Sequence, residues 1–95
     1  MNDKELADKV VAHGVGKTLF TDGSLRKIDG VKAATPVKQF VRDWRVAGAL
    51  MEKLTWKHFH KTVMWGVSVP AKSGLGDKHI EARYLIEACV EALHE

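Results

Sequence analysis

Histidines are the residues of this chain best suited to bind a metal ion, and His58 and His60 lie two positions apart. In a β-strand, side chains at positions i and i+2 share a face, so both imidazoles would face one ion. A metal site needs further ligands, and the remaining candidates are scattered along the sequence: His13, His79, Cys89 and His94. The spacing favours a polar strand end beside a turn, and metal or small-molecule binding at this hairpin is an alternative.

The segment Gly14-Val15-Gly16-Lys17-Thr18 ends like a phosphate-binding loop. That loop needs another glycine five positions before Gly16, where this chain has Val11, and it needs a strand before it and a helix after it. Here a helix is predicted before the glycines and a strand after them. Gly14 is better explained as the residue that ends the first helix. With no pairing of nucleophile and base assignable, we expect a binding protein without catalytic residues, resident metal or cofactor.

The clearest periodic segment is Thr35–Leu54, which we predict to be one helix. Thr35 suits the N-cap, and Pro36 suits the first helical position because its missing N–H is not needed there. Apolar residues recur at spacings of three and four, as expected of a helix packed on a core: Val37, Phe40, Trp44, Ala47, Met51 and Leu54.

The opposite side of this predicted helix is mostly basic and carries Lys38, Arg42, Arg45 and Lys53. These four cations are the candidates for contacting the phosphates of a nucleic acid. Proteins that bind nucleic acids usually combine such charges with exposed aromatic residues or a known module. Phe40 and Trp44 are predicted on the core side, so nucleic-acid binding is the alternative and a solvated face is the simpler reading.

Turn and capping residues place the other elements. Asn2 and Glu5 form a capping box that opens a first helix. Asp22-Gly23 predicts a two-residue hairpin turn between strands at 17–21 and 24–28. A second hairpin is expected from Trp56–Phe59 and Val63–Val69, and a last helix from an N-cap at Asp77 to about Leu93. The predicted order is α-β-β-α-β-β-α.

This order predicts an α+β fold in which a small antiparallel sheet, expected to have four strands, packs with three helices. The 95 residues, 45% of them hydrophobic, suit a single domain spanning residues 1–95. No apolar leader or membrane-spanning run is present, so no membrane partner is expected. The lone cysteine fits a cytoplasmic location, and a net charge of +3 is too small to require a polyanionic partner.

Three segments give the chain a resemblance to small phage and prophage proteins, the phage ABA-sandwich domain family. They are LADKVVAHGVG, the Thr-Pro start and LMEKL end of the central helix, and EARYLIEACVEAL. The first hairpin lacks the tryptophans expected in that family. The resemblance implies helices on the faces of a small antiparallel sheet, a viral or prophage origin and a bacterial host cytoplasm. It implies no activity and no catalytic residues.

We therefore expect a phage or prophage accessory protein that binds a host or viral protein, with inhibition of a host process as one outcome. The residues expected to contact the partner lie on the second hairpin and the loop after it: Trp56, His58, His60, Lys61 and Lys72. Trp56 shares its predicted strand face with two histidines, so that face is either half covered or an exposed contact point. Homodimer formation through an edge strand is a further expectation.

Overall fold

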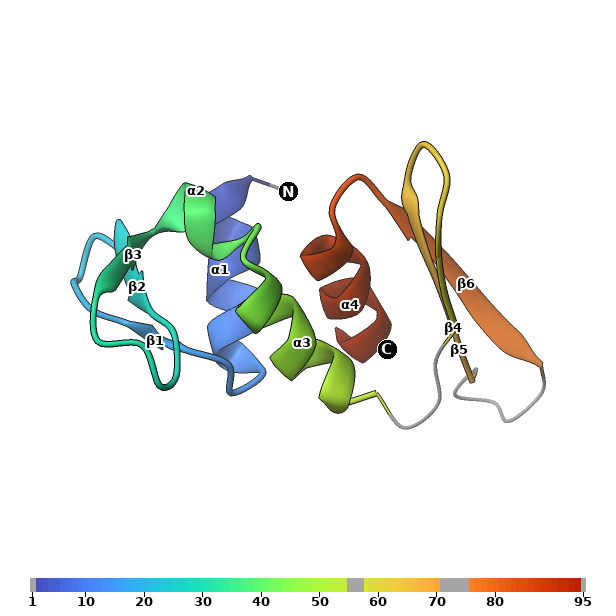
Figure 1. Cartoon of the computed structure of the whole chain (residues 1–95), viewed down its shortest axis with the longest axis horizontal. Helices are drawn as coiled ribbons and strands as arrows, with labels where there is room; N and C mark the ends of the chain where they lie inside the picture. The colour runs from blue at the N-terminus through green and yellow to red at the C-terminus, as the bar shows by residue number, and fades with distance from the viewer. Residues whose placement is uncertain (1, 55–57, 71–75, 95) are drawn as a thin grey trace.

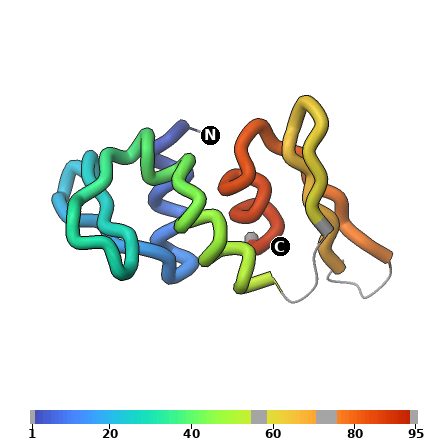
Figure 2. The backbone as a smooth tube through the Cα atoms, viewed as in Figure 1, coloured from blue at the N-terminus to red at the C-terminus, as the bar shows by residue number. Residues whose placement is uncertain are grey.

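The computed structural model describes residues 2–54, 58–70 and 76–94, and it shows an α+β fold with helices between two sheets (Figure 1). Each sheet contains three antiparallel strands, and the chain extends 42 Å along its longest axis. One sheet lies at each end of this axis (Figure 1), and the tube in Figure 2 follows the chain from one end to the other. The elements are α1 (Asp3–Ala12), β1 (Lys17–Thr18), β2 (Leu25–Lys27), β3 (Ala34–Pro36), α2 (Val37–Phe40), α3 (Trp44–Glu52), β4 (His58–Lys61), β5 (Trp65–Pro70), β6 (Asp77–Ala82) and α4 (Leu85–His94).

The α+β class is confirmed, but the predicted element order and the four-stranded sheet differ from the structure. Each half of the chain contains a third strand, and the two hairpins belong to separate sheets, ordered β1-β2-β3 and β4-β5-β6. Both additional strands, β3 and β6, lie where the sequence pattern predicted the start of a helix. In each case pairing with a neighbouring strand overrides the local helix signal.

The first helix forms as predicted, and both of its ends follow local rules. The Asn2 side chain accepts a hydrogen bond from the Glu5 backbone N–H at 2.8 Å and donates to the Glu5 carboxylate. At the other end Gly14 has a φ of 86°. The Val15 N–H then bonds back to the Val10 carbonyl at 3.3 Å, which is the Schellman arrangement.

The first hairpin lies where predicted, but its turn is longer than two residues. Thr18 pairs with Arg26 in the register of β1 and β2. The Leu19 N–H then bonds to the Leu25 carbonyl, and the Gly23 N–H bonds to the Phe20 carbonyl. The chain therefore reverses direction over the whole segment between β1 and β2, and not at Asp22-Gly23 alone. Asp22 accepts hydrogen bonds there from the Ser24 N–H and hydroxyl.

The predicted central helix is broken into two. Thr35 lies in β3 opposite Arg26, and Pro36 precedes α2 without a side-chain cap. Asp43 interrupts the helix because its carboxylate accepts from the Arg45 N–H at 2.8 Å and caps a new helix, α3. The restart turns Trp44 outward, so its predicted core position is wrong. The buried face of α3 instead contains Val46, Ala47 and Leu50.

The second sheet corrects the prediction for the last helix. Asp77 is the first residue of β6 and pairs with Pro70, whereas the helix begins at Leu85. Alternate residues of β6, Ile80 and Ala82, are buried against α4, as expected of a half-buried strand. The β4–β5 turn lies after the predicted one, because the Thr62 N–H bonds to the Met64 carbonyl.

The last helix is buried on two faces because it lies between the second sheet and the other helices (Figure 1). Ala88 and Ala92 pack on the sheet with Val67 and Val69. Ile86 and its apolar neighbours belong to the larger core formed with α1, α2 and α3. This two-sided burial explains why the helix is so rich in alanine and other apolar residues. No helix in the described part of the chain is long and apolar enough to cross a membrane.

Candidate functional site

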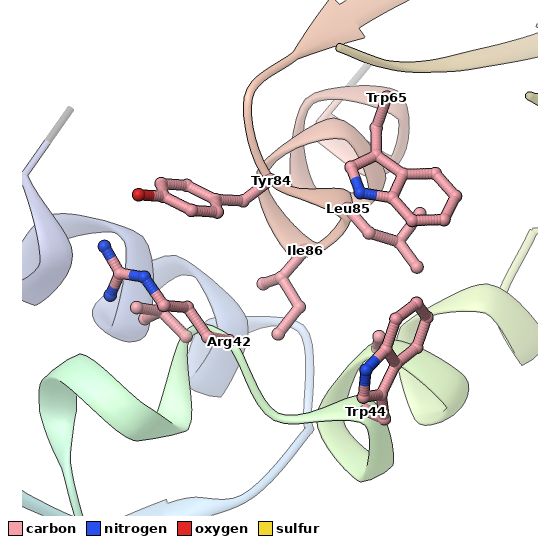
Figure 3. Close-up of a pocket in the computed structure, with 8 residues that line it drawn as sticks. Arg42, Trp44, Trp65, Tyr84, Leu85 and Ile86 are labelled. Carbon is pink, nitrogen blue, oxygen red and sulfur yellow. The ribbon is translucent and has the colours of Figure 1, made fainter. Parts of the chain in front are cut away.

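A cavity of about 200 Å³ lies where the α2–α3 connection faces the start of α4. Figure 3 shows Arg42 and Tyr84 at one side of it and two tryptophans at the other, with Ile86 between them. The described residues that line it are Val41, Arg42, Trp44, Ala47, Trp65, Tyr84, Leu85 and Ile86. The wall is therefore mostly apolar and aromatic, with one cation.

Trp44 is an exposed side chain in the wall of this cavity. It is the first residue of α3, directly after the Asp43 cap, and 68% of its surface is exposed. Its ring meets Trp65 edge to face, with centroids 5.8 Å apart and an interplanar angle of 74°. Trp65 is partly buried at the start of β5. An exposed tryptophan supported by a second aromatic ring is typical of a binding hot spot.

Arg42 supplies the positive charge at the other side of the cavity. Its guanidinium carbon lies 4.3 Å from the centroid of the Tyr84 ring, a cation–π geometry. Its Nη1 donates to the Lys38 carbonyl at 2.7 Å and to an Asp3 carboxylate oxygen at 3.3 Å. Contacts to α1, α2 and the residue before α4 thus hold the guanidinium in place.

The charge of Arg42 changes the acidity of its aromatic neighbour. The guanidinium lowers the pKa of the Tyr84 phenol, first by hydrogen bonding to the phenolate form and then by attraction, and Arg83 acts in the same direction. The same interaction with Tyr84 raises the pKa of Arg42, with a smaller contribution from Asp3. Arg42 is therefore a permanent cation beside an apolar cavity.

The wall of this cavity offers apolar contact surface and one positive charge. Among the lining residues, Arg42 and Tyr84 are the ones with ionisable side chains, and neither is paired with a nucleophile in this wall. A second cation lies beside a residue of the wall, since the Lys61 Nζ is 5.3 Å from the Trp65 ring centroid. Apolar groups can enter the cavity while a carboxylate meets the cationic rim.

The five residues predicted to contact a partner are placed unevenly. Trp56 and Lys72 lie outside the described residues, and His58 is described only as a backbone position of β4. Lys61 lies beside Trp65 of the cavity wall. His60 is turned toward β6, where its ring stacks on His79 with centroids 5.3 Å apart and planes 8° apart. The sequence analysis named His79 as one of the scattered candidate ligands but did not group it with His60, because it comes from a segment predicted to be helical.

The four cations of the predicted basic face do not lie along one helix. Lys38 is in α2, Arg42 is in the connection, Arg45 is in the first turn of α3, and Lys53 follows its end. Two of them are in ion pairs, Arg42 with Asp3 and Arg45 with Asp43 at 2.8 Å. The break at Asp43 thus removes the continuous basic stripe and transfers Arg42 to the cavity.

Sequence reasoning missed the aromatic half of the site, Trp44, Trp65 and Tyr84. A usable signal was present in Arg42-Asp43-Trp44, because an aspartate directly before an apolar residue can start a helix. Reading Asp43 as a cap places Trp44 at the helix start, where it need not face the core. No signal in the sequence places Tyr84 against Arg42, since that contact depends on packing between distant segments.

Comparison with known proteins adds no relative: no family model matches the chain, and neither a curated protein nor a solved structure does.

Proposed function

We propose that this chain is a protein-binding domain and that the cavity between Trp44 and Arg42 is its contact site. The observation that supports this is the pairing of a 68% exposed tryptophan with a fixed arginine across an apolar cavity. Protein contact sites are enriched in tryptophan, tyrosine and arginine, and their energy is concentrated in a few such residues. The absence of a paired acid and base in the described wall supports binding over catalysis.

The partner segment that fits this site carries an apolar or aromatic side chain next to a carboxylate. The side chain enters beside Trp44 and Trp65, where it buries apolar surface. The carboxylate meets Arg42, whose guanidinium has five N–H donors and bonds to Lys38 and Asp3 through Nη1. Lys61 beside Trp65 adds a second positive charge, which favours an acidic segment further.

The biological setting we propose is that of a phage or prophage accessory protein in the bacterial cytoplasm, acting on a host or viral protein and inhibiting a host process. The resemblance to phage ABA-sandwich proteins supports the setting. Having one cysteine, the chain forms no internal disulfide, which suits a reducing compartment.

The test is affinity capture from bacterial lysate followed by quantitative binding with variants. Trp44→Ala should weaken binding of the captured partner at least about tenfold, as expected for a hot-spot residue. Phe20→Ala is the matched control, because Phe20 is an aromatic residue 56% exposed in the β1–β2 connection, outside the cavity. Equal binding by wild type and Trp44→Ala would refute this site.

The alternative is nucleic-acid binding through Lys38, Arg42, Arg45 and Lys53. The same protein preparation can distinguish it from protein binding at the cavity. Binding to DNA or RNA that falls steeply with salt and is lost in Arg42→Glu and Arg45→Glu would favour it. Capture of a protein in nuclease-treated lysate, with weak salt dependence and loss in Trp44→Ala, favours the cavity.

A homodimer through an exposed sheet edge is a separate proposal. Strands β4 and β6 are the two edges of the second sheet, and an edge strand offers unpaired backbone groups to a symmetry mate. Light scattering across a concentration series tests this proposal. If the homodimer forms, the measured mass should rise from that of one chain to that of two.

A further inference from the structure

We infer that the outer face of the second sheet holds a metal site formed by His60, His79 and Glu81, suited to Zn²⁺. The three residues come from the two edge strands and face the same side across β5. Each offers one ligand atom, and these atoms all lie within 4.8 Å of one another. Two imidazoles and one carboxylate are a donor set that zinc accepts, with one position left open.

The strand register brings the three residues together. Gly66 of β5 pairs with His60 on one side and with Glu81 on the other, and Ser68 pairs with His79. His79 and Glu81 are two apart on β6 and therefore share a face. The sequence alone did not group them, because β6 was predicted to be a helix start and His60 belongs to another strand.

Gly66 is the feature that lets His60 reach across the central strand. A Cβ atom at this position would overlap the His60 ring, and Gly66 does not have a positive φ that would explain a glycine by backbone conformation. Glycine inside a strand weakens the strand and often marks close approach of another group. Here the close group is the imidazole, which passes over β5 and stacks on His79.

His79 is already oriented as metal-binding histidines are. Its Nδ1 lies 3.1 Å from the Ser68 hydroxyl, and its Nε2 lies 3.2 Å from a Glu81 carboxylate oxygen. With the ring proton on Nε2, His79 donates to Glu81 and accepts from Ser68. With a metal ion on Nε2, the proton moves to Nδ1 and Ser68 accepts it, which is the usual outer-shell contact of a ligating histidine.

Binding requires only local movement. Ligand atoms around a tetrahedral zinc ion are about 3.3 Å apart, given Zn–N distances of 2.0–2.1 Å. His79 Nε2 and the Glu81 oxygen are already at this separation. His60 must tilt out of its parallel stack so that a ring nitrogen points at the ion. Since His79 and Glu81 are about half exposed, solvent can reach the site and the open position can hold water or a donor from a partner.

The test uses the full chain without a histidine tag and ZnCl₂ as the probe, measured by calorimetry and by competition with a chromogenic chelator. One ion should bind per chain. His79→Gln, His60→Gln and Glu81→Gln should each weaken binding by about tenfold or more, since even outer-shell changes cost 10- to 100-fold. His13→Gln at the end of α1 and Asp77→Asn on β6 are the matched controls, and both should bind as wild type does.

Gly66→Ala separates a built site from chance binding by surface histidines. It keeps all three ligands but displaces the His60 ring, so its affinity should fall to that of His60→Gln. Circular dichroism checks its fold, and if the fold is lost the half-exposed His79 and Glu81 variants decide alone. Co²⁺ in place of Zn²⁺ should give the strong visible absorption of four-coordinate cobalt. Absent binding, or equal binding by wild type, His79→Gln and Glu81→Gln, would overturn the site.

Discussion

The indole of Trp44 meets the ring of Trp65 edge to face at 5.8 Å, although the two residues come from different elements and Trp44 is largely exposed. Aromatic pairs in this geometry contribute about 0.5–1.5 kcal/mol beyond the area they bury. The pair connects α3 to β5 at the surface, over the larger core.

The two tryptophans should therefore differ in their contribution to stability. Trp44→Ala should lower the free energy of unfolding by about 1 kcal/mol, mostly through loss of the aromatic pair. Trp65→Ala should cost about 3 kcal/mol, because Trp65 packs against both apolar clusters. Urea unfolding followed by circular dichroism measures both. Equal costs for the two changes would show that Trp44 is as buried as Trp65.

Tyr84 should titrate below the ordinary pKa of a phenol. The nearby Arg42 guanidinium stabilises the phenolate, so the pKa of Tyr84 falls below 10.0, the ordinary value of a phenol. It is the only tyrosine in the chain, so ultraviolet absorbance of the tyrosinate reports on it alone. Arg42→Gln should raise the midpoint toward the ordinary value. An unchanged midpoint in that variant would mean that the two side chains are apart in solution.

Asp43 should make the free energy of unfolding depend on pH. Hydrogen bonds from Arg45, the side-chain bond first, lower the pKa of the Asp43 carboxyl below 3.8. At a pH between the Asp43 pKa of the folded chain and that of the unfolded chain, the unfolded chain binds more protons. The stabilisation that Asp43 contributes is therefore complete above its pKa in the unfolded chain, and it is lost as the pH falls through its pKa in the folded chain.

Two substitutions separate the helix-capping role of Asp43 from its contribution to the pH dependence of stability. Asp43→Ala removes the α3 cap and should cost about 1 kcal/mol near neutral pH. Asp43→Asn keeps a cap acceptor, so it should cost less, but it should remove this residue's share of the acid dependence. Thermal unfolding at several pH values compares them. An alanine variant as stable as wild type would indicate that α2 and α3 do not need the cap to form separately.

The buried Arg26 should tolerate an apolar replacement better than loss of its partner. Its side chain is fully buried and pairs with the exposed Asp8 at 2.8 Å. Its Nη1 has no hydrogen-bond partner in the described part of the chain. Asp8→Ala leaves this buried charge uncompensated and should cost about 2 kcal/mol, discounted for the exposure of Asp8.

Arg26→Met removes the charge itself and fills similar space, so it should cost less than Asp8→Ala. The double variant should resemble Arg26→Met, because nothing charged is left to pair. Chemical denaturation of all three proteins gives the comparison. If Arg26→Met is the most damaging of them, the hydrogen bond from its Nε to the Gly23 carbonyl holds the first hairpin together.

Elements governed by adjacent residues could be predicted from the sequence. The first helix is the clearest case, since Asn2, Glu5 and Gly14 determine both of its ends within a few positions. The strand β6 could not be predicted in this way. Asp77 is a good helix start in isolation, and only its pairing with Pro70 across the sheet makes it a strand residue.

Of the candidate site, the sequence predicted the charged residues but not the aromatic ones. Arg42 and Lys61 were singled out as charged surface residues; Arg42 lines the cavity, and Lys61 lies beside Trp65 of its wall. Trp44 was misplaced by a single unrecognised cap at Asp43. Tyr84 and His79 acquire their neighbours only through contacts between segments far apart in the chain, which hydrophobic periodicity does not encode.

The missing side chain at Gly66 also limits how this surface can evolve. The His60 ring occupies the volume that a Cβ atom at position 66 would need, so any larger residue there must push the imidazole away from its place over β5. A lineage that keeps the imidazole in this place must therefore keep the glycine. In homologous sequences that have histidine at positions 60 and 79, we expect glycine at 66.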